Sequence, residues 1–259
     1  MSNPLLVVSV TALGVGGATA VGAVLGFLLK RIPHRYNDAI LGFSAGVMLA
    51  ASVFGLIIPA LNSGGKYGVV TVSLGIIAGA LLLSYLDKVM PHLHHLIGVE
   101  GVSEEDHAEG TERLNKMLLF VLAIAIHNFP EGLAAGVSFG TGDIGNALLV
   151  AGGIALQNIP EDMVIISPLV ISGASRGRAL AIALGTGLVE VVGTFFGYFA
   201  VSISGAILPF ALAFAGGTML YVISDEMIPE THSHGFEKGA TFSIIAGFIV
   251  IMIMDRLMS

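Results

Sequence analysis

Residues 127–132 read HNFPEG, and this stretch governs how the rest of the chain is interpreted. It places a His, an Asn and a Glu inside an otherwise apolar run, and a near-copy, QNIPED, follows at residues 157–162. A carboxylate at the centre of a lipid bilayer costs about 2.5–3.5 kcal/mol on insertion scales. Because two such carboxylates need a partner that neutralises them, the motifs predict a bound divalent cation.

The composition around the motifs is typical of polytopic membrane proteins. Of the 259 residues, 55% are hydrophobic and 11% are charged, and the mean hydropathy is +0.91. The chain has no Cys, so a metal site must use nitrogen, oxygen or thioether ligands. The net charge of −7 and the lack of a Lys/Arg-rich run exclude the nucleic-acid-binding class. The expected surroundings are a lipid bilayer.

The apolar runs predict eight membrane spans in a single transmembrane domain, residues 1–259, because each crossing needs about 20 mostly apolar residues. The spans cover approximately residues 5–29, 39–61, 67–86, 117–139, 144–171, 179–201, 206–228 and 239–254. A long polar segment, about residues 90–116, separates the third span from the fourth and contains His92, His94 and His95. The expected fold class is an all-α polytopic membrane protein.

The Lys and Arg residues predict the orientation of the chain. One set of alternate connections contains nine of them: Lys30, Arg31, Arg35, Lys88, Arg113, Lys116, Arg176, Arg178 and Lys238. The other set contains Lys66 and Arg256. Since cytoplasmic loops carry the excess of positive charge, both termini are expected outside the cytoplasm and the polar segment inside it. The predicted location is a bacterial inner (plasma) membrane.

Internal symmetry is visible in two pairs of spans. The fourth and fifth spans share the pattern x-N-x-P-E, although on this topology they run in opposite directions. The second span reads FSAGVML before Ile58-Pro59, and the seventh, also antiparallel to it, reads FAGGTML before Ile228-Pro229. Inverted repeats around broken helices are typical of secondary transporters. We therefore expect inverted repeats around a central pair of kinked helices.

Each motif presents its polar side chains on one face of a helix. Residues four apart share a face, so His127 points with Glu131, and Gln157 points with Glu161. An Asn lies beside each pair: Asn128 and Asn158. These amides offer oxygen ligands to a metal, or they cross-link helices by hydrogen bonds.

The proline in each motif, Pro130 or Pro160, removes a backbone N–H and predicts a kink that opens room for water or an ion. Glu190 is a further isolated carboxylate within a span, and Met48 offers a thioether or simply fills space in the core. Carboxylates, one imidazole and amide oxygens suit Zn²⁺, Fe²⁺, Mn²⁺ or Cd²⁺.

These residues resemble the ZIP family of divalent-metal transporters, especially its short bacterial members. HNFPEG in the fourth span and QNIPE in the fifth are similar to the metal motifs of that family, and the eight-span pattern and the His-rich segment agree with it. The resemblance covers essentially the whole chain. It implies a homodimer and alternating access in which one helix bundle slides against another.

The resemblance also implies a binuclear metal centre. One metal would be bound by His127, Glu131, Gln157, Glu161 and Met48. The other would be bound by Asn128, Asn158 and Glu190, with Glu131 and Glu161 as bridges. Asp162 departs from the family pattern, because a Gly such as Gly132 usually occupies that position. Its carboxylate could bind metal, face water or alter selectivity.

Further polar side chains crowd the cytoplasmic end of the seventh span: Asp225, Glu226, Glu230, His232 and His234. Asp225 and Glu226 lie too deep for ordinary loop charges, so a metal exit path or sensor site is expected there. His92, His94 and His95 form a second candidate accessory site. Alternatively, they are incidental histidines of a solvated loop.

The sequence favours a carrier, not an enzyme, that moves divalent transition-metal ions, Zn²⁺ first among them. The resemblance to the ZIP family implies that the ions move into the cytoplasm. An intramembrane metallohydrolase would need a held metal, an open water position and a general base. Only one of the eight His residues lies within a predicted span, and no H-E-x-x-H motif is present. A membrane metal sensor that does not transport is the third possibility.

Overall fold

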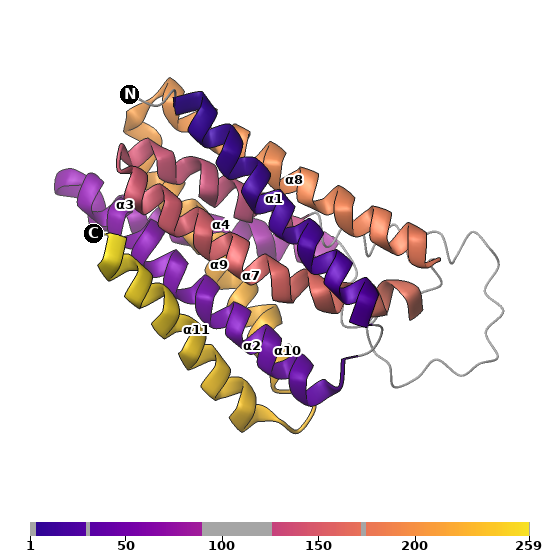
Figure 1. Ribbon diagram of the computed structural model, residues 1–259. Coiled ribbons are helices and arrows are strands. Elements are labelled where there is room, and N and C mark those ends of the chain that lie inside the picture. Colours follow the sequence, from indigo (N-terminus) through magenta and orange to yellow (C-terminus); the bar gives the residue numbers. More distant parts are fainter. Residues whose placement is uncertain (1–3, 30–31, 90–125, 172–174, 259) are drawn as a thin grey trace.

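The computed structural model describes residues 4–29, 32–89, 126–171 and 175–258, and its regular elements there are all helices (Figure 1). Residues 126–138 are helical. The other elements are α1 (Pro4–Leu29), α2 (His34–Ala50), η1 (Ala51–Ile57), α3 (Ile58–Ser63), η2 (Gly65–Tyr67), α4 (Gly68–Val89), η3 (Phe139–Thr141), α7 (Ile144–Ile171), α8 (Arg176–Ile203), η4 (Gly205–Ile207), α9 (Leu208–Val222), η5 (Ile223–Met227), α10 (Ile228–Thr231) and α11 (Glu237–Met258).

Six helical stretches of the described chain are long and apolar enough to cross a membrane: Pro4–Leu29, His34–Ser63, Gly65–Leu86, Gly177–Ile203, Gly205–Thr231 and Glu237–Met258. They correspond to six of the eight expected spans, so the protein is an α-helical integral membrane protein. The other two expected spans are α7 and the stretch that contains residues 126–138; their crossing of the bilayer stays a prediction. The polar segment, with His92, His94 and His95, lies outside the described residues.

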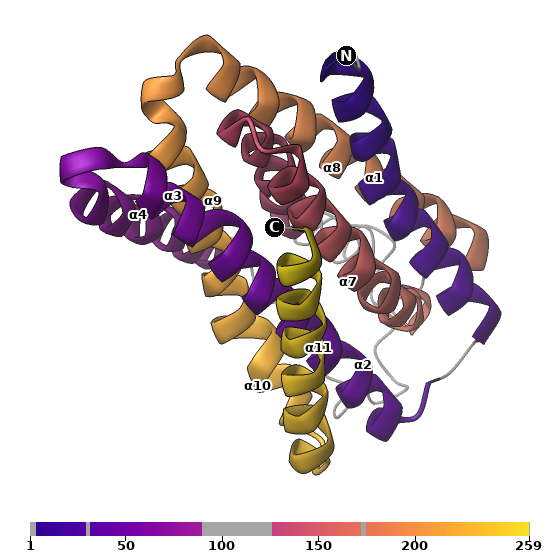
Figure 2. The ribbon, with the colours of Figure 1, turned by 60° about the vertical axis from the view of Figure 1, so that its left-hand side comes forward.

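Glycines set the spacing between the helices. A Cβ on Gly187 of α8 would lie 2.6 Å from the carbonyl oxygen of Gly16 of α1, and a Cβ on Gly42 of α2 would lie 2.8 Å from that of Ala240 of α11. Gly75 of α4 approaches the backbone of α9 in the same way. Small residues let helix backbones come this close. Figure 2 shows the resulting neighbours: α1 beside α8, α2 beside α11, and α4 beside α9.

The expected second and seventh spans are each interrupted by a π-helical stretch. η1 ends directly before Ile58-Pro59, and η5 ends directly before Ile228-Pro229. Proline has no N–H to donate to the preceding turn, and π-helical turns occur mostly as short bulges inside α-helices, frequently at functional sites. The two interrupted spans run in opposite directions (Figure 2). This agrees with an inverted repeat, which stays a prediction.

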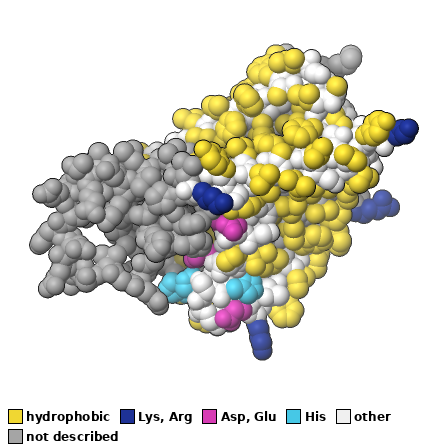
Figure 3. Space-filling view, turned by 180° about the vertical axis from the view of Figure 1, so that it is seen from behind, with side chains coloured by type: hydrophobic (Ala, Val, Ile, Leu, Met, Phe, Trp, Pro, Cys, Tyr) yellow, Lys and Arg dark blue, Asp and Glu magenta, His cyan; other side chains and the backbone are white. Residues whose placement is uncertain are grey.

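The ends of the bundle differ from its sides. The described surface visible in Figure 3 is mostly hydrophobic, and His and acidic side chains gather toward one end. The two termini of the described chain lie toward the same end of the bundle (Figure 1). A hydrophobic surface of this kind is suited to face lipid, because the hydrocarbon layer offers no partner to polar groups.

Candidate metal site

A short turn brings the two motifs together. Residues 126–138 are connected to α7 through η3 and Gly142, whose φ of 75° lies in the left-handed region that glycine adopts without strain. Asp143 then caps α7: its Oδ1 accepts a hydrogen bond from the backbone N–H of Asn146 at 3.1 Å. The helices on either side of the turn are therefore antiparallel neighbours, and the two motifs face each other.

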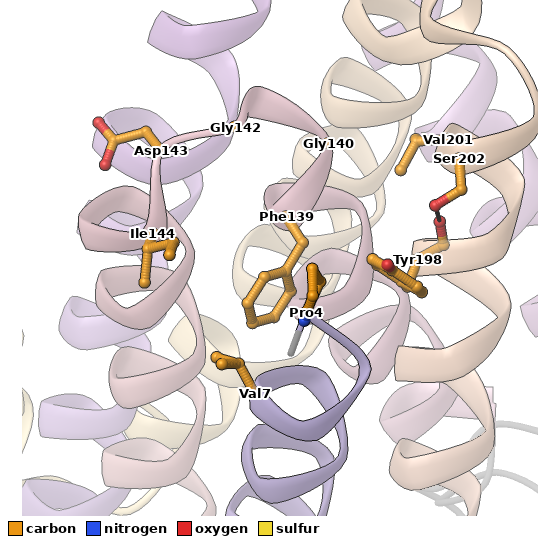
Figure 4. A pocket seen from close by; sticks show the side chains of 10 residues that line it. All are labelled: Pro4, Val7, Phe139, Gly140, Gly142, Asp143, Ile144, Tyr198, Val201 and Ser202. Atoms are coloured by element: carbon orange, nitrogen blue, oxygen red, sulfur yellow. Dashed lines mark hydrogen bonds between the residues drawn. The ribbon is translucent and has the colours of Figure 1, made fainter. Parts of the chain in front are cut away.

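A cavity of about 400 Å³ lies at this turn, at the end of the bundle (Figure 4). Its lining includes Pro4, Val7, Phe139, Tyr198 and Asp143. Asp143 is the one ionisable carboxylate among its lining residues, and its Oδ1 already serves as the cap of α7. The cavity lies about two helical turns beyond Glu131, so it is separate from the motifs.

The first polar cluster joins His127, Glu131, Glu161 and Gln157. His127 Nε2 lies 2.9 Å from Glu161 Oε1 and 3.8 Å from Glu131 Oε1. One ligand atom from each of these three residues lies within 4.8 Å of the others. Gln157 Nε2 donates a hydrogen bond to Glu131 Oε1 at 2.5 Å. The structure thus brings together four of the five side chains expected at the first metal, all but Met48; their role as ligands stays a prediction.

The second polar cluster surrounds Glu190, which is fully buried on α8. Asn128 Nδ2 donates to its Oε1 at 2.8 Å, and Asn158 Nδ2 donates to its Oε2 at 2.8 Å. Thr19 of α1 also donates to Oε1, at 2.5 Å, and accepts from Asn158 at 3.0 Å. Sequence reasoning missed Thr19, because a single Thr in an apolar helix carries no signal of its partner.

Several buried atoms in the two clusters and directly beside them have no hydrogen-bond partner. They are Gln157 Oε1, Asn158 Oδ1, Glu161 Oε2 and Asp162 Oδ1, together with His127 Nε2, which approaches Glu161 without the alignment of a hydrogen bond. Leaving a buried polar atom unpaired costs about 1–3 kcal/mol. Four of the five are oxygens and the fifth is an imidazole nitrogen. This donor set therefore fits a divalent transition metal as the missing partner.

Met48 and Asp162 border the clusters. Met48 is 1% exposed, and Ser44, one turn earlier on α2, donates a hydrogen bond to the backbone carbonyl of Gln157 at 3.2 Å. Met48 therefore lies on the face of α2 that meets α7. Asp162 is buried and packs against α1, because a Cβ on Gly22 would lie 3.0 Å from its Cβ. Its carboxylate thus lies on the side of the Glu190 cluster.

Of the residues expected at a metal exit path or sensor site, one contacts the first cluster and the others lie farther from it. Glu226, on η5, reaches the first cluster, since its Oε2 lies 3.7 Å from His127 Nδ1. Asp225, its neighbour, is exposed. Glu230 is part of α10, and His232 follows it and contacts the Ile228 carbonyl and Thr241. The π-helical stretch therefore connects the centre of the protein with the end at which α10 lies.

We expect Thr19→Val to weaken the second cluster. The substitution keeps the shape of the side chain but removes a hydrogen bond to a buried carboxylate, a loss of about 1.5–3 kcal/mol. Thermal unfolding of the purified variant should show a lower Tm than that of the wild-type protein. Thr11→Val, on the same helix, is the matched control. Equal Tm values for the two variants would show that the Thr19 hydroxyl does not support Glu190.

Comparison with known proteins identifies the family. The ZIP zinc transporter family model matches residues 94–255. The chain is 43% identical over 252 residues to the zinc transporter GufA of Myxococcus xanthus, covering 95% of this chain and 96% of GufA. It is 40% identical to the zinc transporter ZIPB of Bordetella bronchiseptica (92% and 77% covered) and 32% identical to the zinc transporter ZIP11 of Homo sapiens (92% and 93% covered). The chain belongs to the ZIP family of zinc transporters.

Proposed function

We propose that this protein is a secondary transporter that carries divalent transition-metal ions into the cytoplasm, with Zn²⁺ as its main substrate and Cd²⁺, Fe²⁺ and Mn²⁺ as further candidates. The observation that carries the proposal is the convergence of His127, Glu131 and Glu161 within 4.8 Å of one another inside the helix bundle. Ionisable groups at such depth mark ion pathways. Three relatives that match nearly the whole chain are named zinc transporters.

The two clusters form one binuclear site in this proposal. Gln157 belongs to the first cluster and Asn158 to the second, so successive residues of α7 connect them. The first metal is bound by His127, Glu131, Gln157, Glu161 and Met48. The second is bound by Asn128, Asn158 and Glu190, with Glu131 and Glu161 as bridges. Amide and carboxylate ligands hold zinc less firmly than the thiolates of structural sites, and a carrier must release its ion.

The direction of transport and the assembly complete the proposal. Both termini face away from the cytoplasm, and Glu226 and Asp225 lead the ion from His127 toward the cytoplasmic end, where Glu230 and His232 lie. Asp162 tunes selectivity at the second metal, and the His92–His95 region binds metal in the cytoplasm. The sequence contains no P-loop, so an ion gradient supplies the driving force. Two copies form a homodimer, each a single transmembrane domain.

Uptake into proteoliposomes tests the function. The wild-type protein should give saturable Zn²⁺ influx into vesicles loaded with a metal-sensitive dye. His127→Ala should lower the influx to the level of protein-free vesicles, because it removes the only imidazole of the first cluster. Competition by Cd²⁺, Mn²⁺ and Fe²⁺ ranks the substrates. Zn²⁺ binding without influx in the wild type would contradict a carrier and favour a sensor or a hydrolase.

A further inference from the structure

A group of His and acidic side chains lies away from the two clusters, where the start of α2 meets α10 and the turn that follows it. Its members are His34, Asp38, Glu230 and His234. Each of the two segments contributes one imidazole and one carboxylate, four residues apart. α10 lies beside the beginning of α2 (Figure 2). Two short segments almost 200 positions apart in the sequence thus combine ligands of the types that bind zinc.

Asp38 is the buried member of this group. It is 0% exposed, although it lies in the second turn of α2, close to the end of the bundle. Its Oδ1 lies 3.0 Å from Nδ1 of His234, and its buried Oδ2 has no hydrogen-bond partner. A carboxylate on one imidazole nitrogen fixes the orientation and tautomer of the ring, and in metal sites it leaves the opposite nitrogen for the ion.

The opposite nitrogen of His234 meets a second carboxylate. Nε2 lies 4.0 Å from Oε1 of Glu230, and the two side chains are 27% and 26% exposed. Two ligands of a tetrahedral zinc ion are about 3.3 Å apart, so a small rotation of either partly exposed side chain closes the gap. The Ser233 hydroxyl, 3.4 Å from Nε2, is exposed and can turn away. The His34 ring stacks on His234 with 4.4 Å between ring centroids and supports its orientation.

We propose that His234 and Glu230 bind a divalent transition-metal ion at this end of the protein, with Asp38 as the carboxylate that orients His234. The ion binds Nε2 of His234 and a carboxylate oxygen of Glu230, and water completes its coordination. An imidazole and a carboxylate favour Zn²⁺ or a similar ion over Mg²⁺ or Ca²⁺. The site does not require the transport proposed above, because binding can be measured in a chain whose central site has been removed.

The test is Zn²⁺ titration calorimetry on full-length protein in lipid nanodiscs, in a His127→Ala/Glu161→Ala background. Adding His234→Ala or Glu230→Ala should reduce the number of bound ions by one per chain. Asp38→Asn should keep the ion but weaken its binding about 10–100-fold, the usual effect of losing an orienting carboxylate. Glu237→Ala, an exposed acid of the same region, should leave the titration unchanged.

Helix content by circular dichroism and elution volume show whether each variant is folded. Co²⁺ provides a second readout, since tetrahedral nitrogen and oxygen ligands give visible absorption that His234→Ala should remove. The proposal is overturned by a folded His234→Ala variant that binds as many ions, with the same affinity, as the background. An unchanged affinity in folded Asp38→Asn would overturn the role of Asp38. Neither result affects the interpretation of the uptake assay, because that assay tests the central clusters.

Discussion

Glu161→Ala should abolish saturable Zn²⁺ uptake and leave the amount of folded protein unchanged. Glu161 Oε1 lies 2.9 Å from His127 Nε2, its Oε2 is buried without a partner, and the proposed site uses it at both metals. The substitution therefore removes a negatively charged ligand from the proposed binding site of the metal ion. Because Oε2 of Glu161 makes no hydrogen bond, removing it leaves no buried group without a partner, and the fold should tolerate the change. Proteoliposome uptake and the yield of monodisperse protein measure the two effects.

Two further variants make this result specific. Glu161→Gln keeps the shape of the side chain and removes its charge. If the charge itself binds the metal, Zn²⁺ uptake by this variant should also fall to the level of protein-free vesicles. Glu237→Ala removes an exposed carboxylate of α11 and should transport at the wild-type rate. Zn²⁺ uptake at the wild-type rate by Glu161→Ala would contradict the proposed metal site. Loss of uptake in Glu237→Ala would show that net charge, not ligation, had been tested.

Gly132→Ala should impair both folding and transport, although it adds a single methyl group. A Cβ at Gly132 would lie 2.8 Å from the Cα of Glu190, and the neighbouring atoms belong to the backbone of α8, which cannot turn away. Overpacking of this kind typically costs about 1–3 kcal/mol. The helices must separate, and this also pulls Asn128 away from the Glu190 carboxylate. A lower Tm together with a several-fold loss of uptake is the expected result.

Gly185→Ala is the matched control for Gly132→Ala. Gly185 lies on α8, the helix that Gly132 contacts, but a Cβ there would have no atom within 4 Å. Alanine favours a helix over glycine by about 1 kcal/mol, so this variant should be as stable as the wild type or slightly more stable. If the two alanine variants had the same Tm, the close approach of the two backbones at Gly132 would not limit stability.

The fold was readable from the sequence where it depends on local pattern. The first span was expected at about residues 5–29 and α1 is Pro4–Leu29; the fifth was expected at 144–171 and α7 is Ile144–Ile171. The second and seventh spans were each expected as one apolar run, and the structure divides both with a π-helical stretch. Hydropathy does not distinguish an α turn from a π turn, because it depends only on which residues the run contains and not on how their backbone hydrogen bonds are paired.

The candidate site was predictable in part. The i, i+4 spacing placed His127 with Glu131 and Gln157 with Glu161, and the depth of these groups in apolar runs indicated a metal. The same sequence gave no reason to connect Thr19 with Glu190, or Asp38 with His234. Those pairs lie 171 and 196 positions apart. Their contacts depend on the register of helices that meet only in the folded chain.

The sequence by itself determined that this is a membrane protein of the ZIP family and which side chains of its two motifs share a helix face. Apolar length and helical periodicity are properties of each segment alone, so they need no knowledge of neighbours. The tertiary structure decided which motif side chains meet across helices, which atoms remain unpaired, and which distant residue joins them. Glycine contacts set how closely each pair of helices packs, and that spacing determines which polar atoms lie within reach of one another.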